Sequence, residues 1–187
     1  MDTAKIEEAI TMLISAIGDD PTRPGLIDTP QRAAKMYAEM FEGVGYTNDE
    51  IADMFNKCFE DAQGSDWVLV KDISIFSFCE HHFALMYNMK AHIAYKPTTK
   101  VIGLSKMSRI AGMVAKRLQL QERIGYDIAY VLKKILGTND VMVVLEGEHS
   151  CMTARGVRAQ GSGTRTCCAD GVFKSDTSLR QEVFLCL

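Results

Sequence analysis

The chain has 187 residues, of which 47% are hydrophobic and 24% are charged. This composition is typical of a globular protein with one main core, and it excludes disordered, collagen-like and coiled-coil architectures. Lys and Arg together number 21 against 24 Asp and Glu, a net charge of −3, which excludes the broad basic surface of most nucleic-acid binders but leaves room for a local anion site.

The sequence shows no candidate membrane span and no secretory leader. No stretch approaches the roughly 18–20 apolar residues that cross a bilayer, and the first residues lack a basic segment followed by an apolar run. Six cysteines without a secretory signal indicate free thiols or metal ligands rather than disulfides. We therefore expect a soluble, cytoplasmic protein that binds neither membranes nor nucleic acid.

Three helices are expected at the N-terminus. Apolar residues recur at helical spacing over residues 3–17. A Thr-Pro pair, as N-cap and first helical residue, begins a second helix over residues 29–41, and an acidic run begins a third over residues 48–58. We assign residues 1–62 to an N-terminal helical region.

A β-hairpin follows in the sequence. Residues 67–76 are rich in β-branched and aromatic residues, which predicts a strand, and residues 90–95 predict a second one. The loop between them contains Cys-Glu-His-His at residues 79–82. If the two strands pair, this cluster lies at the tip of the hairpin.

The second half of the chain predicts two helices and a further pair of strands. The expected segments are helices over 105–118 and 121–136, strands over 141–145 and 156–166, and a connecting loop over 149–155. We assign residues 63–187 to one α+β domain of antiparallel strands in the order strand, strand, helix, helix, strand, strand. Its two sheet edges must be covered, and pairing between subunits would do so, which favours a homo-oligomer.

Three residues form a candidate metal site. Cys79, His82 and Cys151 supply two thiolates and one imidazole, a donor set that suits zinc, and three protein ligands leave a fourth position open, as in catalytic zinc sites. The alternative is that the cysteines are small buried hydrophobic residues and the histidine pair has no role. The other four cysteines have no histidine nearby and are interpreted as structural thiols: Cys58, Cys167, Cys168 and Cys186.

His81 and His149 each lie beside a candidate ligand and are not needed to complete the metal site. An imidazole with an ordinary pKa near 6.5 is a natural proton carrier beside an activated water, so both are candidate catalytic residues. His92, between Ala91 and Ile93, is interpreted as a packed strand residue.

Candidate anion-binding residues occur in two places: Ser105, Lys106 and Arg109 at a helix start, and Arg155 with Arg158 beyond Cys151. Cations at a helix N-terminus suit a phosphate better than the helix itself, although they could equally form a solvated surface. The segment 121–123, Gln-Glu-Arg, could cap a helix, or its carboxylate could bind two adjacent N–H donors such as a guanine edge.

These motifs, in this order, resemble GTP cyclohydrolase I of the zinc-dependent type from about Asp20 to the C-terminus. The matching segments are Asp28–Tyr37, Cys79–His82, Val101–Lys106, Arg117–Arg123, His149–Met152 and Arg155–Arg158. The resemblance implies a tunnelling fold, in which units of two hairpins and two helices assemble through sheet edges into rings. It also implies a homodecamer whose active sites are shared between neighbouring subunits.

The resemblance also implies a reaction. Cys79, His82 and Cys151 would bind zinc, and a water activated there would attack carbon 8 of GTP, or of a closely related purine nucleotide, while His81 protonates nitrogen 7. Release of formate and rearrangement of the ribose would then give 7,8-dihydroneopterin triphosphate, a pterin of the kind used in tetrahydrofolate biosynthesis. The remaining implied roles are His149 near the ribose and the leaving formyl group, Ser105 in the sugar steps, Glu122 with Gln121 at the guanine edge, and Lys106, Arg109 and Arg155 at the triphosphate.

Two segments depart from the family pattern. Residues 83–90 lack the usual proline and contain one extra residue, and residues 152–154 read Met-Thr-Ala in place of a Met-rich stretch. These departures keep two alternatives open. One is a cyclohydrolase that stops at a ring-opened or formylated pyrimidine or uses another purine nucleotide, and the other is a non-catalytic regulatory module that binds zinc and nucleotide.

Overall fold

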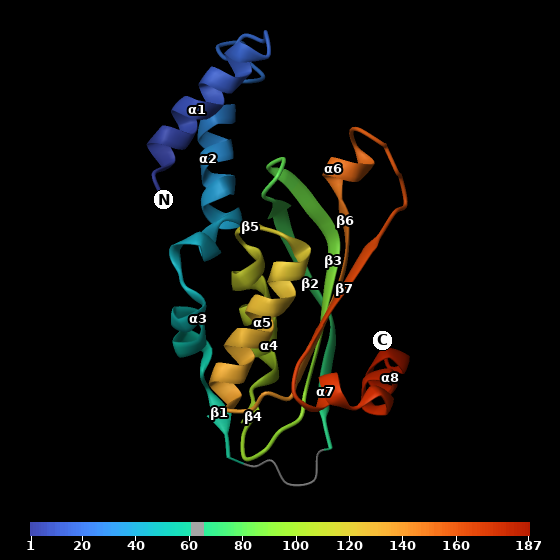
Figure 1. Cartoon of the computed structure of the whole chain (residues 1–187). Coiled ribbons are helices and arrows are strands. Elements are labelled where there is room, and N and C mark those ends of the chain that lie inside the picture. The colour runs from blue at the N-terminus through green and yellow to red at the C-terminus, as the bar shows by residue number, and fades with distance from the viewer. Residues whose placement is uncertain (61–65) are drawn as a thin grey trace. The chain divides into compact units, whose positions relative to one another are not determined.

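The computed structural model describes residues 1–60 and 66–187 (Figure 1). The chain forms two compact units, residues 1–45 and 46–187. The boundary that we expect between residues 62 and 63 lies outside the described residues and stays a prediction.

The N-terminal helices form largely as expected. They are α1 (Thr3–Ala16), α2 (Thr29–Met40) and the short 3-10 helix η1 (Glu42–Gly45) in the first unit, and α3 (Asn48–Phe55) in the second. The expectation that Thr29 caps the second helix is wrong. The N-cap is Asp28, because the first helical bond runs from the Arg32 N–H to the Asp28 carbonyl at 3.1 Å.

The second unit is built on one five-stranded sheet in the order β5-β2-β3-β6-β7. All neighbouring strands are antiparallel except β5, which runs parallel to β2. The strands are β2 (Val68–Cys79), β3 (Ala84–Tyr95), β5 (Leu118–Gln119), β6 (Val141–His149) and β7 (Thr164–Ala169). A separate pair joins β1 (Cys58–Phe59) to β4 (Val101–Ile102). This order confirms the expected α+β class.

Two long helices cover one face of the sheet (Figure 1). They are α4 (Leu104–Ala115) and α5 (Gln121–Leu136), and α5 has the bounds expected from its periodicity. Ile124, Ile128 and Leu132, four residues apart, are fully buried against the sheet with Ala91 and Ile93. Burial of such side chains contributes roughly 1.5–3 kcal/mol each, so this layer is the main source of stability.

The opposite face of the sheet carries a smaller apolar cluster that the sequence patterns do not predict. Two short helices, α7 (Val172–Ser175) and α8 (Thr177–Leu185), follow β7. They place Phe173 and Val183 against Met142 and Val144 of β6.

The last expected strand, over residues 156–166, is wrong in its bounds. Strand β7 begins only at Thr164, and the expected loop 149–155 contains a one-turn helix, α6 (Ser150–Thr153). Gly156 and Gly161 have φ angles of 58° and 78°, a left-handed conformation that interrupts an extended strand. The connection to the β7 edge is therefore longer than expected.

Candidate metal centre

The sheet register brings the two parts of the candidate metal site to one end of the domain. Because β3 pairs with β2 on one side and with β6 on the other, the β2–β3 turn and the end of β6 lie together (Figure 1). Cys79 lies opposite Ala84, and His149 lies opposite Met86. The turn of residues 80–83 therefore lies beside α6, which carries Cys151.

The three expected ligands meet. The ligand atoms of Cys79, His82 and Cys151 lie within 4.8 Å of one another. A tetrahedral zinc ion with bonds of about 2.1–2.3 Å holds its ligands about 3.5–3.8 Å apart, so only a small contraction is needed. Cys79 is buried, Cys151 is half-buried and His82 is exposed, which leaves one side open to solvent. Two sulfurs and one imidazole fit zinc, with a fourth position for water or substrate.

The surroundings of the Cys151 thiol disfavour its charged, metal-binding form. Burial raises the pKa of the Cys151 thiol, and the neighbouring Cys79 raises it further. Thiolates are the forms that bind metal, so a divalent cation between them would offset their repulsion as it displaces the protons.

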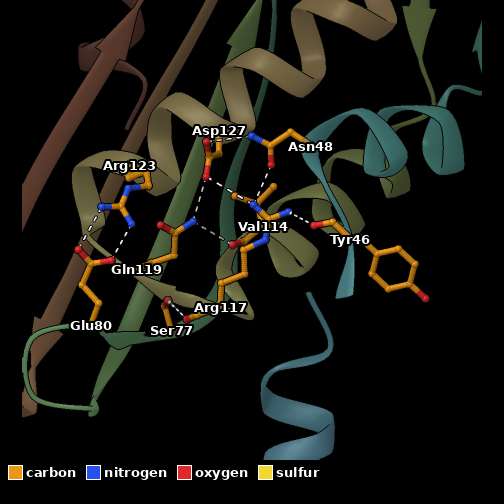
Figure 2. A network of polar contacts seen from close by, with 9 residues as sticks. All are labelled: Tyr46, Asn48, Ser77, Glu80, Val114, Arg117, Gln119, Arg123 and Asp127. Carbon is orange, nitrogen blue, oxygen red and sulfur yellow. Dashed lines mark hydrogen bonds and ion pairs between the residues drawn. The ribbon is translucent and has the colours of Figure 1, made fainter. Parts of the chain in front are cut away.

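Glu80, between the two parts of the Cys-Glu-His-His motif, is fixed by Arg123 of α5. The Arg123 guanidinium donates to the two carboxylate oxygens of Glu80 at 2.6 and 3.0 Å (Figure 2). The Glu80 N–H donates to the Gln119 carbonyl at 3.2 Å. This guanidinium also holds the pKa of the Glu80 carboxyl below its usual value. The turn that carries His82 is thus tied to β5 and to the first turn of α5.

A polar network around the buried Gln119 and the half-buried Arg117 and Asp127 lies next to this pair (Figure 2). Asp127 of α5 accepts from the Gln119 side-chain amide at 3.0 Å and pairs with Arg117 at 3.6 Å. Arg117 also donates to the Asn48 side chain at 2.8 Å and to the Tyr46 carbonyl at 2.9 Å. Burial lowers the pKa of Arg117, which Asp127 partly reverses. Sequence reasoning missed this network, because its members are far apart in the chain and share no motif.

His149 lies at the end of β6 beside Gln121. The two side chains meet through Nε2 of His149 and Oε1 of Gln121 at 2.8 Å. Burial lowers the pKa of the His149 imidazole, and the charge of Glu122 partly opposes this shift. Gln121 is only 1% exposed, whereas Glu122 is exposed at the start of α5.

The other expected site residues fall into two groups. His81 is exposed and its ring centroid lies 6.4 Å from that of His82, and Arg155 is exposed four residues after Cys151. Both belong to the end of the domain that carries the ligands. His92, in contrast, is 4% exposed and its Nδ1 accepts the Asp72 N–H at 3.2 Å, which confirms it as a packed strand residue.

The start of α4 is remote from the ligands. The N-cap of α4 is Gly103, and the Lys106 ammonium lies 5.8 Å from the centre of the Phe55 ring. The helix begins after β4 and leads to β5, whose Gln119 pairs with Cys79. Because 12 helical residues span about 18 Å, a single chain does not bring Ser105 and Lys106 to the metal ligands. Arg109, one turn further along, is exposed.

All six cysteines are free, as expected. Among residues 1–60 and 66–187, no helix combines the length and the apolar character needed to cross a bilayer.

Comparison with known proteins places these features in one family. The profile of the GTP cyclohydrolase I family matches residues 6–187. GTP cyclohydrolase 1 of Clostridium botulinum (strain Loch Maree / Type A3) is 54% identical over 99% of this chain and 97% of that protein. The enzyme of the same name from Ruminiclostridium cellulolyticum is 55% identical over the same shares, and that of Clostridium acetobutylicum is 53% identical over 96% and 94%. The chain belongs to the GTP cyclohydrolase I family.

Proposed function

We propose that this protein is a zinc-dependent GTP cyclohydrolase I, which hydrolyses the imidazole ring of GTP, releases formate and forms 7,8-dihydroneopterin triphosphate. The observation that carries the proposal is the convergence of Cys79, His82 and Cys151 in a chain that matches the family over residues 6–187. When bound there, zinc would lower the pKa of a coordinated water far below that of bulk water, to about 7, and so supply a nucleophile for carbon 8.

The residues around the ligands provide the proton transfers. His81 is exposed beside His82, where its imidazole can protonate nitrogen 7 as the ring opens. His149 would act on the ribose and the formyl group. It lies two residues before Cys151, and its carbonyl accepts a hydrogen bond from the Thr153 hydroxyl. The exposed carboxylate of Glu122 would accept the N–H donors of the guanine edge.

Triphosphate binding requires a second copy of the chain. Lys106 and Arg109, which we propose as phosphate ligands, and Ser105, which we propose for the sugar steps, lie on α4 at or near the end away from the cysteines. Arg155 lies near the cysteines. A complete site therefore joins the metal end of one subunit to the α4 start of another. We propose that the chain is a homo-oligomer, with a decamer as the expected form.

The nucleotide substrate and the six free thiols also support a cytoplasmic location.

The direct test is an assay of purified, zinc-loaded protein with GTP. Formate should be released, and the product should fluoresce as a neopterin after oxidation and dephosphorylation. Mass analysis separates the alternatives, because an enzyme that stops early gives a formylated or ring-opened pyrimidine nucleotide. Saturable GTP binding without turnover would instead indicate a regulatory module. A protein that neither binds GTP nor turns it over would refute the proposal.

A further inference from the structure

Gln121 is a buried amide whose nitrogen and oxygen both have hydrogen-bond partners within the chain. Its Nε2 donates to the Thr164 carbonyl at 3.0 Å and to the Leu145 carbonyl at 3.2 Å, with the Thr166 hydroxyl at 3.4 Å as a third acceptor. Its Oε1 lies 2.8 Å from Nε2 of His149. The side chain therefore connects the β6–β7 ladder to His149 from the first position of α5.

These partners determine which end of the amide is oxygen. Two of the three acceptors around Nε2 are backbone carbonyls, which cannot donate a hydrogen. In the flipped amide, the oxygen would face both carbonyls with no hydrogen between them, and a buried unmatched contact of this kind is costly. The Gln121 oxygen must therefore face His149, and an amide oxygen only accepts.

The orientation of the Gln121 amide determines which atom donates in its hydrogen bond with His149. Nε2 of His149 must carry a hydrogen in order to donate to the Gln121 oxygen, whether the imidazole is neutral or charged. We propose that Gln121 is a positioning residue that fixes the orientation of the His149 ring and holds it in the Nε2–H tautomer. The importance of this for turnover rests on the proposed function, but the tautomer itself does not.

This inference changes the expected part of Gln121. A side-chain contact with guanine would require Gln121 to release the carbonyls of Leu145 and Thr164 or the imidazole of His149. Glu122, the next residue, is exposed and free of that requirement. We therefore assign the guanine edge to Glu122 and the orientation of His149 to Gln121.

The tautomer can be measured on the unaltered, zinc-loaded protein. Magic-angle-spinning NMR of protein labelled with ¹⁵N and ¹³C in its four histidines, at about pH 8 where imidazoles are neutral, separates protonated from unprotonated ring nitrogens. Loss of one signal set in His149→Ala assigns the residue. Protonated Nε2 and unprotonated Nδ1 are expected for His149, and protonated Nδ1 with unprotonated Nε2 would overturn the inference even if the protein has no activity with GTP.

Kinetics separate positioning from guanine binding. Gln121→Met has a similar shape but cannot accept from His149, so kcat should fall about 10- to 100-fold while KM for GTP changes less than about threefold. A mixture of both His149 tautomers should appear in its NMR spectrum. The control is Thr166→Val, which removes the longest acceptor and keeps both carbonyls, and it should retain wild-type kinetics and a single tautomer. A large rise in KM with unchanged kcat in Gln121→Met would assign the side chain to guanine and overturn the proposal.

Discussion

Arg123, in the first turn of α5, and Glu80, in the β2–β3 turn, form a bidentate ion pair with N···O distances of 2.6 and 3.0 Å (Figure 2). Glu80 follows the candidate ligand Cys79, and Arg123 follows the proposed guanine-binding Glu122. The pair therefore couples the metal turn to the helix start that would hold the base. Its planar geometry suits a guanidinium and cannot be matched by an ammonium.

We predict that Arg123→Lys weakens zinc binding about tenfold, because the turn that carries His82 loses one of its two bonds to α5. Competition with a coloured chelator measures the affinity directly. The matched control is Lys134→Gln, at the other end of α5, which breaks an exposed pair with Asp49. An Arg123→Lys variant with unchanged zinc affinity would show that the backbone bond between Glu80 and Gln119 is sufficient to hold the turn.

Replacing a ligand should remove both the metal and the activity. In Cys151→Ser we expect bound zinc, measured by elemental analysis, to fall well below one per subunit, and turnover of GTP to fall by about 10³-fold or more because water is no longer activated. Cys167→Ser changes an exposed thiol outside the cluster and should retain both properties. Full zinc content in Cys151→Ser would exclude Cys151 as a ligand.

A pH effect on stability is expected from His92. Burial lowers the pKa of this imidazole, and its Nδ1 accepts the Asp72 N–H, a bond that protonation would break. Because the folded pKa lies below the unfolded value near 6.5, the unfolded state binds more protons in acid, so the free energy of unfolding should fall as the pH drops below about 6.5. Four charged side chains also act electrostatically on the pKa of His92: Glu146 and Asp72 raise it, and Arg165 and Lys71 lower it.

His92→Asn tests this effect, because its side-chain oxygen can still accept from Asp72 but does not titrate in this range. Urea unfolding of zinc-free protein at about pH 5.5 and 7.5 should show a smaller loss of stability in the variant than in the wild type. His149 has a lowered pKa as well and titrates in both proteins, so the difference between them isolates His92. Equal losses in both proteins would exclude His92 as the source.

The left-handed backbone conformation of Asn88, in the altered segment 83–90, can be tested by substitution. It has a φ of 50° at the irregular register between β3 and β6, and its amide donates to Glu148 at 2.9 Å. Asn88→Ala and Asn88→Gly both lose this bond, but only Ala resists the left-handed conformation. We expect Asn88→Ala to be less stable than Asn88→Gly by about 1 kcal/mol in urea unfolding. Equal stabilities would show that the bulge rearranges.

How much of the molecule the sequence predicts depends on the range of the interaction involved. Helix α5 has its expected bounds because a row of apolar residues at helical spacing and the left-handed Gly137 at its end are local signals. The site motif also has a local signal, since cysteine and histidine side by side in a loop suggest metal binding. The pairing of β2 with β3 places Cys79 at the tip of the hairpin. The pairing of β3 with β6, which joins distant parts of the chain, is also needed to bring Cys151 to it.

Hydrogen-bond and packing partners from distant segments of the chain could not be predicted from the sequence. Nothing near Gln121 in the sequence indicates that its amide turns toward the carbonyls of Leu145 and Thr164 rather than toward a ligand. The sequence likewise does not pair Arg123 with Glu80, 43 residues earlier. Helix α8 has weak apolar periodicity, and its role as a cover for the second sheet face becomes visible only once Val183 packs on β6.

The separation between Lys106 and the cysteines predicts complementation between defective subunits. Cys151→Ser and Lys106→Gln should each be nearly inactive alone, since one lacks metal and the other a phosphate ligand. When the two variants are co-expressed in one oligomer, some sites are intact. In these sites the metal end comes from a Lys106→Gln subunit and the α4 start comes from a Cys151→Ser subunit. Random mixing should restore about one quarter of the sites.

Co-expression of Cys151→Ser with His82→Ala is the control, because all three candidate ligands come from one chain and no intact site can form. Mixed oligomers of the first pair with no recovered activity would place the whole site within a single subunit.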